Sequence, residues 1–352
     1  MPNVESARAR RVIRWLWAAS LAASGCIWWA KRQFLRRGAV VPLTFHRVLR
    51  DADYHRTNSL PGMLLRERTF RDLVAHVARC YEPVDLRKTE PGARSRRLKL
   101  AFTFDDGWID TYTVAFPIAQ EHGIPLTFFI CPGLIDEEAP FWQEQVVAFT
   151  RAAQPSTGME QAAALIENLK SAEPHHRDRY LAQLREEARK TPGAVVPTGI
   201  DRTLSWAKVA EMSRQGVRIG AHTQTHQILT KISQGEARQE VRLSKTAIES
   251  ELGADCDTFA YPNGNWSPET REIVAEAGFE LAVTTRRGAW MKGSDRLTIP
   301  RSNISEDNVA GPTGRFSAAM FAYSTIWKAW RASRAEYRLR SRAQERRTPI
   351  TA

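Results

Sequence analysis

Short apolar runs recur along the middle of the chain, and longer segments with helical spacing separate them. Seven of these runs predict β-strands with at least one face in a core. They lie at residues 40–45, 98–104, 125–130, 217–220, 258–262, 281–285 and 296–300. Amphipathic helices are predicted between them, for example over residues 69–81 and 267–279, the second of which opens with Ser267 and carries Glu269 in its first turn. This alternation favours an α/β fold with a parallel sheet or barrel.

One segment breaks the alternation. Residues 136–200 are mostly polar and helical in pattern, so we expect an insertion that flanks or covers a site. The chain shows no internal repeat, and its 352 residues with 43% apolar content suffice for one barrel-sized core or two smaller ones.

The N-terminal segment contains an apolar stretch at residues 15–30 with tryptophans at both edges and basic residues on both sides. Tryptophan and basic flanks are typical of a segment lodged in a bilayer. A helix over this stretch spans about 24 Å, less than the roughly 30 Å hydrocarbon core. The alternatives are a crossing with snorkelling Arg and Lys, a re-entrant hairpin or an interfacial helix. A cleaved signal peptide is a further alternative, although the basic residues that follow are unlike a cleavage site.

The C-terminal segment has large apolar side chains on one predicted helical face, followed by a basic run at residues 331–347. The residues on this face are Phe316, Met320, Tyr323, Trp327 and Trp330. An aromatic face beside arginines predicts a helix on an anionic membrane surface. A terminal helix docked on the core, with a solvated basic tail, is the alternative.

The distribution of charge argues against a nucleic-acid-binding body. The net charge is +12, but residues 1–37 and 315–352 carry +7 each, and the 277 residues between them carry −2. We therefore expect an anionic membrane surface as a partner and no nucleic acid, with the protein on the bacterial inner membrane. Both flanks of the apolar stretch are basic, so the face of the membrane stays open. The four cysteines have neither zinc-ribbon nor disulfide-framework spacing.

Two carboxylates, Asp105 and Asp106, follow the predicted strand at residues 98–104 and precede Gly107. Asp and Gly are common in turns, which is the simplest explanation of the pair. Chemistry in parallel α/β folds, however, is assembled at the carboxyl ends of strands, which is where this pair falls.

Two histidines, His222 and His226, directly follow the predicted strand at residues 217–220. Their spacing of four places both imidazoles on one face of a helical turn, within reach of one ion. A lone histidine pair is more often on the surface or satisfied in a core. Together with Asp106, the pair supplies two nitrogen ligands and one oxygen ligand and leaves a position open for water, as in catalytic zinc sites.

These segments resemble the polysaccharide deacetylases with a NodB homology domain, carbohydrate esterase family 4, over about residues 38–305. The T-F-D-D-G motif of that family is matched by residues 103–107, and its H-[ST]-x-x-H motif by His222, Thr223 and His226. Residues 259–264, FAYPNG, resemble its R-x-P-Y motif. The resemblance implies a distorted (β/α) barrel with the site at the carboxyl ends of the strands. It is greatest to poly-N-acetylglucosamine deacetylases that begin with a strand followed by histidine.

The resemblance also implies roles for residues. Asp106, His222 and His226 would hold a divalent metal, zinc or alternatively cobalt or nickel, and Asp105 would be the general base. A backbone N–H near Asn263 would contribute to the oxyanion hole, in place of the family's tyrosine.

Two further departures from the family pattern stand out. Ala260 occupies the position of an arginine that orients the catalytic aspartate, and Arg301 is the candidate replacement. No histidine follows His226, so the usual C-terminal general acid is missing, and His46 is the candidate substitute.

The resemblance implies a hydrolase that removes N-acetyl groups from an amino-sugar polysaccharide. Two alternatives remain open: deacylation or deformylation of a lipid-linked amino sugar, and a glycan-binding protein without turnover. The predicted organisation is a membrane-associated segment at 1–37, the deacetylase domain at 38–305 with its helical insertion at about 136–200, and an amphipathic helix with a basic tail at 306–352.

Overall fold

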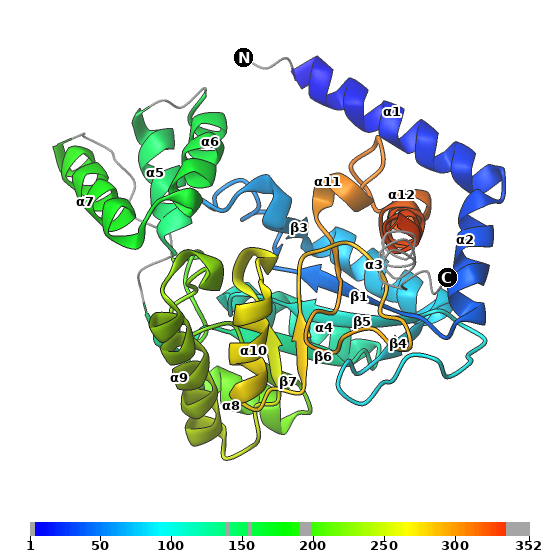
Figure 1. Cartoon of the computed structure of the whole chain (residues 1–352). Helices are drawn as coiled ribbons and strands as arrows, with labels where there is room; N and C mark the ends of the chain where they lie inside the picture. Colours follow the sequence, from blue (N-terminus) through cyan, green and yellow to red (C-terminus); the bar gives the residue numbers. More distant parts are fainter. Residues whose placement is uncertain (1–3, 138–140, 154–156, 191–198, 336–352) are drawn as a thin grey trace, which may run out of the picture.

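A parallel β-sheet forms the centre of the protein (Figure 1). The computed structural model describes residues 4–137, 141–153, 157–190 and 199–335. The strand order is β10-β1-β5-β6-β7-β8-β9, with β4 paired to β5 outside this path, and every pairing is parallel. The strands are β1 (Val40–Phe45), β4 (Glu82–Val84), β5 (Lys99–Phe104), β6 (Leu126–Ile130), β7 (Arg218–Ala221), β8 (Thr258–Ala260), β9 (Leu281–Val283) and β10 (Ser302–Asn303). β2 (Arg47–Leu49) and β3 (Leu64–Arg66) form a separate parallel pair.

Helices follow or separate the strands, as expected for an α/β fold. The α-helices that surround the sheet are α3 (Glu67–Cys80), α4 (Phe116–Glu121), α8 (Trp206–Arg214), α9 (Gln234–Leu252), α10 (Pro268–Glu276) and α11 (Glu306–Val309). Short turns of helix include η1 (Pro61–Met63), η3 (Pro132–Leu134), η4 (Leu229–Lys231) and η5 (Pro262–Gly264), and a π-helix, η2 (Thr111–Ala115), precedes α4. Apolar side chains such as Phe45, Phe102, Phe104 and Phe128 fill the core beside the sheet.

Six of the seven predicted strands are present, and residues 296–300 are the exception. In this segment only Ile299 forms an isolated bridge, to Val283, and the chain turns before it. The Asp295 carboxylate accepts the Leu297 backbone N–H (3.0 Å), so an Asx-turn occupies the start of this segment, and backbone hydrogen bonds to β9 are limited to Arg296 and Ile299. The strand that does join this edge of the sheet is β10, slightly later in the chain.

Three helices occupy the described part of residues 136–200: α5 (Trp142–Ala153), α6 (Gly158–Ser171) and α7 (Pro174–Lys190). They share a small core of their own, which includes Val146, Ile166 and Leu181. Figure 1 shows these helices standing together beside the sheet. The domain boundaries predicted from the sequence stay a prediction.

The N-terminal apolar stretch is divided between two helices, α1 (Val4–Ala23) and α2 (Cys26–Arg36). The chain turns at Gly25, whose φ of 78° lies in the left-handed region. α2 buries Ile27, Ala30 and Phe34 against the core. Among the described residues, we find no helix with both the length and the apolar character needed to cross a membrane.

The C-terminal aromatic face packs on the protein core. α12 (Ala318–Ala322) continues through the π-helix η6 (Tyr323–Trp327), and α1 lies against α12. Met320 is buried, while Phe316, Tyr323, Trp327 and Trp330 are partly buried against the core. The aromatic face therefore belongs to a terminal helix docked on the core, which was the alternative, and not to a helix on a membrane surface. Most of the basic run at 331–347 lies outside the described residues.

Candidate active site

A cavity of about 520 Å³ lies at the carboxyl edge of the sheet. The loops after β1, β5, β7 and β8 line one side of it, and the helical insertion lines the other. The predicted site residues among its lining are His46, Asp105, Asp106, His222, His226 and Asn263. Parallel strands end at a common edge, which explains how residues far apart in sequence meet here.

Asp106, His222 and His226 form a compact set of possible metal ligands. The Asp106 Oδ1 lies 3.6 Å from the His222 Nε2 and 3.4 Å from the His226 Nε2, and one ligand atom from each residue lies within 4.8 Å of the others. Tetrahedral zinc with bonds of about 2.0–2.1 Å places neighbouring ligand atoms about 3.3 Å apart. The three donors therefore fit a zinc-sized divalent ion.

The tautomer of His222 also suits a metal. Its Nδ1 lies 2.7 Å from the Ala260 carbonyl oxygen, which has no proton to give, so Nδ1 donates and Nε2 keeps its lone pair. Burial lowers the pKa of His222 to about 4, which keeps the ring neutral near pH 7. Burial raises the pKa of Asp106, but the His226 imidazole and the other nearby histidines outweigh burial and hold this pKa well below the ordinary value.

The backbone at the site is unusual. Four of the five non-glycine residues with positive φ in the described chain lie here: Asp106 (75°), Thr223 (61°), His226 (61°) and Asn263 (57°). A non-glycine residue in this region costs roughly 1–2 kcal/mol. The surrounding structure has to hold these residues in place, and their clustering supports this region as the candidate functional site.

Arg301 contacts Asp105. The sequence had suggested Arg301 as the replacement for the arginine that is missing at Ala260. Its Nη1 and Nη2 donate to the two Asp105 carboxylate oxygens at 2.8 and 2.7 Å. Nη1 also donates to Thr103 Oγ1, and Nε donates to the Thr284 carbonyl oxygen. Burial raises the pKa of Asp105, but the Arg301 guanidinium, together with His222 and His46, outweighs burial and lowers this pKa below the ordinary value. Asp105 is therefore an anion at neutral pH.

His46 and Asn263 lie at different depths. His46 is half-buried, and its Nδ1 has no hydrogen-bond partner among the described residues. Asn263 is exposed at the rim of the cavity, where its Oδ1 accepts a hydrogen bond from Lys170 Nζ at 3.1 Å. The geometry brings His46 to the cavity with the two aspartates, while Asn263 lies on the side nearest the insertion.

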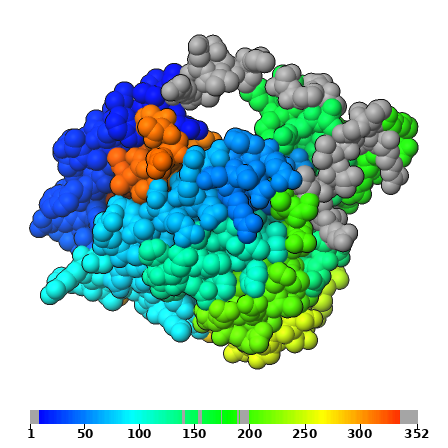
Figure 2. All heavy atoms as spheres, turned by 180° about the vertical axis from the view of Figure 1, so that it is seen from behind, coloured from blue at the N-terminus to red at the C-terminus, as the bar shows by residue number. Residues whose placement is uncertain are grey.

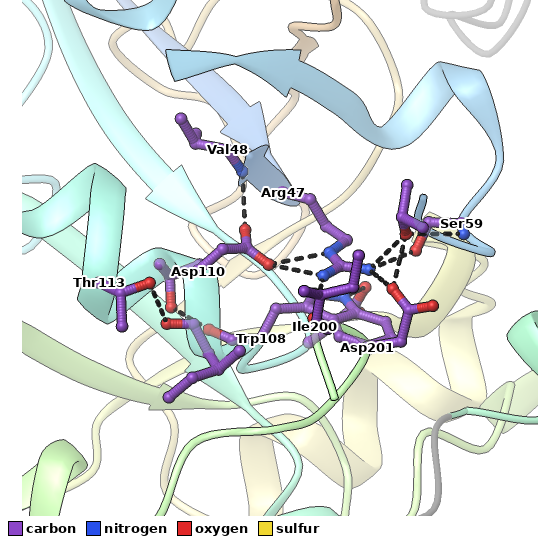
Figure 3. Close-up of polar contacts among 12 residues, drawn as sticks. Arg47, Val48, Ser59, Trp108, Asp110, Thr113, Ile200 and Asp201 are labelled. Atoms are coloured by element: carbon purple, nitrogen blue, oxygen red, sulfur yellow. Dashed lines mark hydrogen bonds and ion pairs between the residues drawn. The ribbon is translucent and has the colours of Figure 1, made fainter. Parts of the chain in front are cut away.

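A buried network around Arg47 was not predicted from the sequence (Figure 3). The Arg47 guanidinium donates to Asp110 at 2.9 Å and to Asp201 at 2.5 Å, and stacks 4.3 Å from the centre of the Trp108 ring. The Trp108 indole N–H donates to Asp106 Oδ2 at 3.1 Å. Through Trp108, the network thus helps to position Asp106, one of the candidate metal ligands. Trp108 directly follows the motif and could have been suspected, but nothing in the sequence pairs Arg47 with a residue 154 positions away.

Comparison with known proteins now identifies the family. A sequence model of the polysaccharide deacetylases matches residues 93–282, more than half of the chain. The chain belongs to the polysaccharide deacetylase family. The resemblance drawn from the motifs is therefore confirmed.

A curated relative of this chain is distant in sequence. The Bacillus subtilis protein YxkH, named as a polysaccharide deacetylase, is 21% identical over 218 residues, which is 62% of this chain. The match spans only 56% of YxkH.

Solved structures share the fold. The Streptococcus pyogenes deacetylase PplD aligns with a TM-score of 0.52 at 18% identity, covering 78% of this chain and 96% of that one. IcaB from Ammonifex degensii aligns with a TM-score of 0.51 at 18% identity, covering 81% and 97%. Together with the curled parallel sheet, these alignments confirm the predicted distorted (β/α) barrel.

Proposed function

We propose that this protein removes N-acetyl groups from an amino-sugar polysaccharide by hydrolysis that depends on a divalent metal. The observation that carries the proposal is an anionic carboxylate, Asp105, beside a two-histidine, one-aspartate set with zinc-like spacing. Membership of the polysaccharide deacetylase family supports the same reaction. The relative PplD was solved with acetate, which is the acid product expected here.

Asp105 is the proposed general base. A divalent metal bound by Asp106, His222 and His226 would supply a Lewis acid that promotes ionisation of water and polarises the acetamide carbonyl. Asp105 accepts a proton from the attacking water, and the two hydrogen bonds from Arg301 fix the direction of its carboxylate. Arg301 is therefore a positioning residue.

His46 is the proposed general acid. Water adds its oxygen to the carbonyl carbon, the C–N bond breaks, and the nitrogen must gain a proton to leave as an amine. His46 lies at the cavity with one ring nitrogen unpartnered within the protein as described. The backbone N–H near Asn263 is the proposed donor to the developing oxyanion. The products are acetate and a free amino sugar.

Acetate release tests this proposal. Full-length protein loaded with zinc, cobalt or nickel is incubated with N-acetylated saccharides of several linkages, and acetate is quantified with and without a chelator. We expect release from at least one saccharide and its loss on chelation. A metal-loaded protein that releases acetate from none of the substrates would contradict the proposal.

A lipid-linked saccharide is the second candidate substrate, and the exposed side chains of the N-terminal helices favour it. Trp17 and Trp28 are 58% and 61% exposed, and Ile13 and Leu16 are exposed beside them. α1 and α2 also carry many basic residues. We propose that this face docks on an anionic bilayer surface, such as the bacterial inner membrane, and brings the enzyme to its substrate. Figure 2 shows α1 and α2 (blue) and the insertion (green) at opposite corners of one end of the molecule.

A further inference from the structure

Glu144 is a buried carboxylic acid in the active-site cavity for which the reaction above has no use. It lies in the first turn of α5, is only 2% exposed, and lines the same cavity as Asp105 and Asp106. A buried carboxyl group is unfavourable unless its polar atoms are satisfied, so its presence at this position calls for a function.

The two oxygens of Glu144 differ in their surroundings. Oε1 accepts a hydrogen bond from Ser59 Oγ at 2.8 Å. Oε2 is buried and has no hydrogen-bond partner among the described residues. Glu144 therefore lines the cavity with one oxygen fixed to the protein and one buried oxygen whose hydrogen-bonding capacity is unused.

The fixed oxygen is held by a rigid group. Ser59 Oγ accepts a hydrogen bond from Arg47 Nη1 at 2.9 Å, and this nitrogen also bonds Asp201. Figure 3 shows Arg47 at the centre, with Ser59 and Asp201 on one side and Asp110 on the other. Through Trp108 the same group contacts Asp106. The position of Glu144 is thus tied to that of the metal-ligand candidates.

We propose that Glu144 binds the sugar during deacetylation, with Oε2 hydrogen-bonded to a polar group of the residue that carries the acetamide. This inference rests on the proposed function, because it needs a saccharide in the cavity. Glu144 comes from the helical insertion, so the insertion supplies part of the substrate site. Trp142, which is only partly buried, also lines the cavity and offers a ring on which a sugar can pack.

The acid acts mainly as a hydrogen-bond donor. Burial raises the pKa of Glu144 to about 8, even though Ser59 and Arg47 act in the opposite direction. Because Ser59 donates to Oε1, the proton of the neutral acid lies on Oε2. The partner is then an acceptor on the sugar, a hydroxyl or carbonyl oxygen.

Two substitutions at Glu144 separate the effect of its hydrogen bonds from the effect of its side-chain volume. Glu144→Gln keeps an acceptor for Ser59 and places an N–H donor at the free position, whereas Glu144→Leu keeps the volume and removes both. Removing one partner of a buried hydrogen bond corresponds to roughly a 10- to 100-fold effect. We expect Glu144→Leu to lower kcat/KM for an N-acetylglucosamine pentamer by about this factor, and Glu144→Gln to stay within about threefold of the parent.

Binding is measured separately from turnover. In an Asp105→Asn background, calorimetry on metal-loaded full-length protein gives the Kd of the pentamer with and without each Glu144 substitution. We expect weaker binding for Glu144→Leu at equal metal content and melting temperature. If Glu144→Leu folds poorly, Glu144→Asp replaces it in this experiment. Its side chain is shorter by one methylene group, so the carboxyl group is drawn back and binding of the pentamer should also weaken. Glu160→Gln, an exposed acid of the same insertion, is the matched control.

The outcomes distinguish the two proposals. Acetate release by the parent together with unchanged Kd and kcat/KM in Glu144→Leu would overturn the role of Glu144 and leave the proposed function standing. Pentamer binding that depends on Glu144 without acetate release by the parent would support the binding site and contradict the proposed reaction. Equal losses in Glu144→Leu and Glu144→Gln with lowered melting temperatures would assign Glu144 a structural role.

Discussion

Arg301 and Asp105, 196 residues apart in the sequence, form a buried ion pair with two nearly parallel hydrogen bonds of 2.8 and 2.7 Å. Arg301 is fully buried and Asp105 is 2% exposed. An arginine fork fixes both oxygens of a carboxylate, which a single lysine contact does not do. The proposed base is therefore held both charged and oriented.

Substitution of Arg301 should lower both the free energy of unfolding and the rate of turnover. Breaking a buried pair leaves an uncompensated charge, so we expect Arg301→Met to lower the free energy of unfolding by about 3–5 kcal/mol. Arg301→Met combined with Asp105→Asn should be less destabilised than the sum of the two single variants. Urea unfolding measures all three. Arg71→Met, in an exposed pair with Glu121, is the control and should change stability by less than about 1 kcal/mol. Additive effects at positions 105 and 301 would contradict the pairing.

Substitution of a metal ligand and substitution of the base should affect different measured properties. Asp106→Ala, His222→Ala and His226→Ala each remove a ligand, so bound metal and activity should fall together. Asp105→Asn should keep the metal and lose turnover. Metal analysis after dialysis, alongside acetate release, measures both. Metal absent from Asp105→Asn, or retained in all three ligand variants, would contradict the assignment.

His46 should matter for rate and not for metal binding. If it protonates the leaving amine, His46→Ala should reduce kcat by roughly 10² to 10⁴ with metal content unchanged. His122→Ala, at an exposed position, should leave kcat and metal content at parental values. A His46→Ala variant that is fully active, or that unfolds without a selective loss of rate, would point to a structural histidine.

Glu144 should make the metal-free protein less stable as the pH rises. Its pKa of about 8 in the folded protein exceeds the ordinary 4.5, so the folded state binds this proton more tightly than the unfolded chain does. The contribution is fully present below about pH 4.5 and is lost as the pH rises towards 8. The groups that act on this pKa are Ser59, Arg47, Asp106 and Asp201.

Urea unfolding between pH 5 and 8 tests this prediction. Glu144→Gln does not titrate, so its stability relative to the parent should rise with pH, on the order of 1 kcal/mol per pH unit at most. For the exposed control Glu160→Gln the difference from the parent should stay nearly constant. A constant difference for Glu144→Gln as well would show that the buried acid does not hold a proton in this range.

The exposed tryptophans of α1 and α2 should determine binding to vesicles. Deleting residues 1–37 would also uncover core contacts of Ile27 and Phe34, so point substitutions are the cleaner test. We expect Trp17→Ser with Trp28→Ser to reduce co-sedimentation with anionic phospholipid vesicles several-fold, without loss of acetate release from a free oligosaccharide. Trp266→Ser, at a 37% exposed tryptophan elsewhere, is the control. Parental protein that remains in the supernatant at low salt would contradict membrane docking.

The sequence could predict the strands and site residues whose signals are local. β1 lies where its apolar run predicted it, and the motif residues Asp105, Asp106, His222 and His226 directly follow strands. The strand predicted at 296–300 is reduced to a single bridge at Ile299, and the Asx-turn of Asp295 at the start of this segment is a local hydrogen bond that propensity does not register.

Other features depend on three-dimensional packing alone. The helical face that carries Trp327 and Trp330 has the same pattern whether it meets a bilayer or a core, and only packing shows that it meets the core. Glu144 looks like an ordinary first-turn acid of an amphipathic helix, and its burial arises from α5 closing over Ser59 and Arg47.

The left-handed backbone conformation at Asp106, Thr223 and His226 lowers the stability of the fold at the candidate site. Each of these residues holds a conformation that glycine would adopt with less strain, by roughly 1 kcal/mol or more. The side chains of Asp106 and His226, two of the candidate metal ligands, are therefore presented from a backbone conformation that is costly for folding.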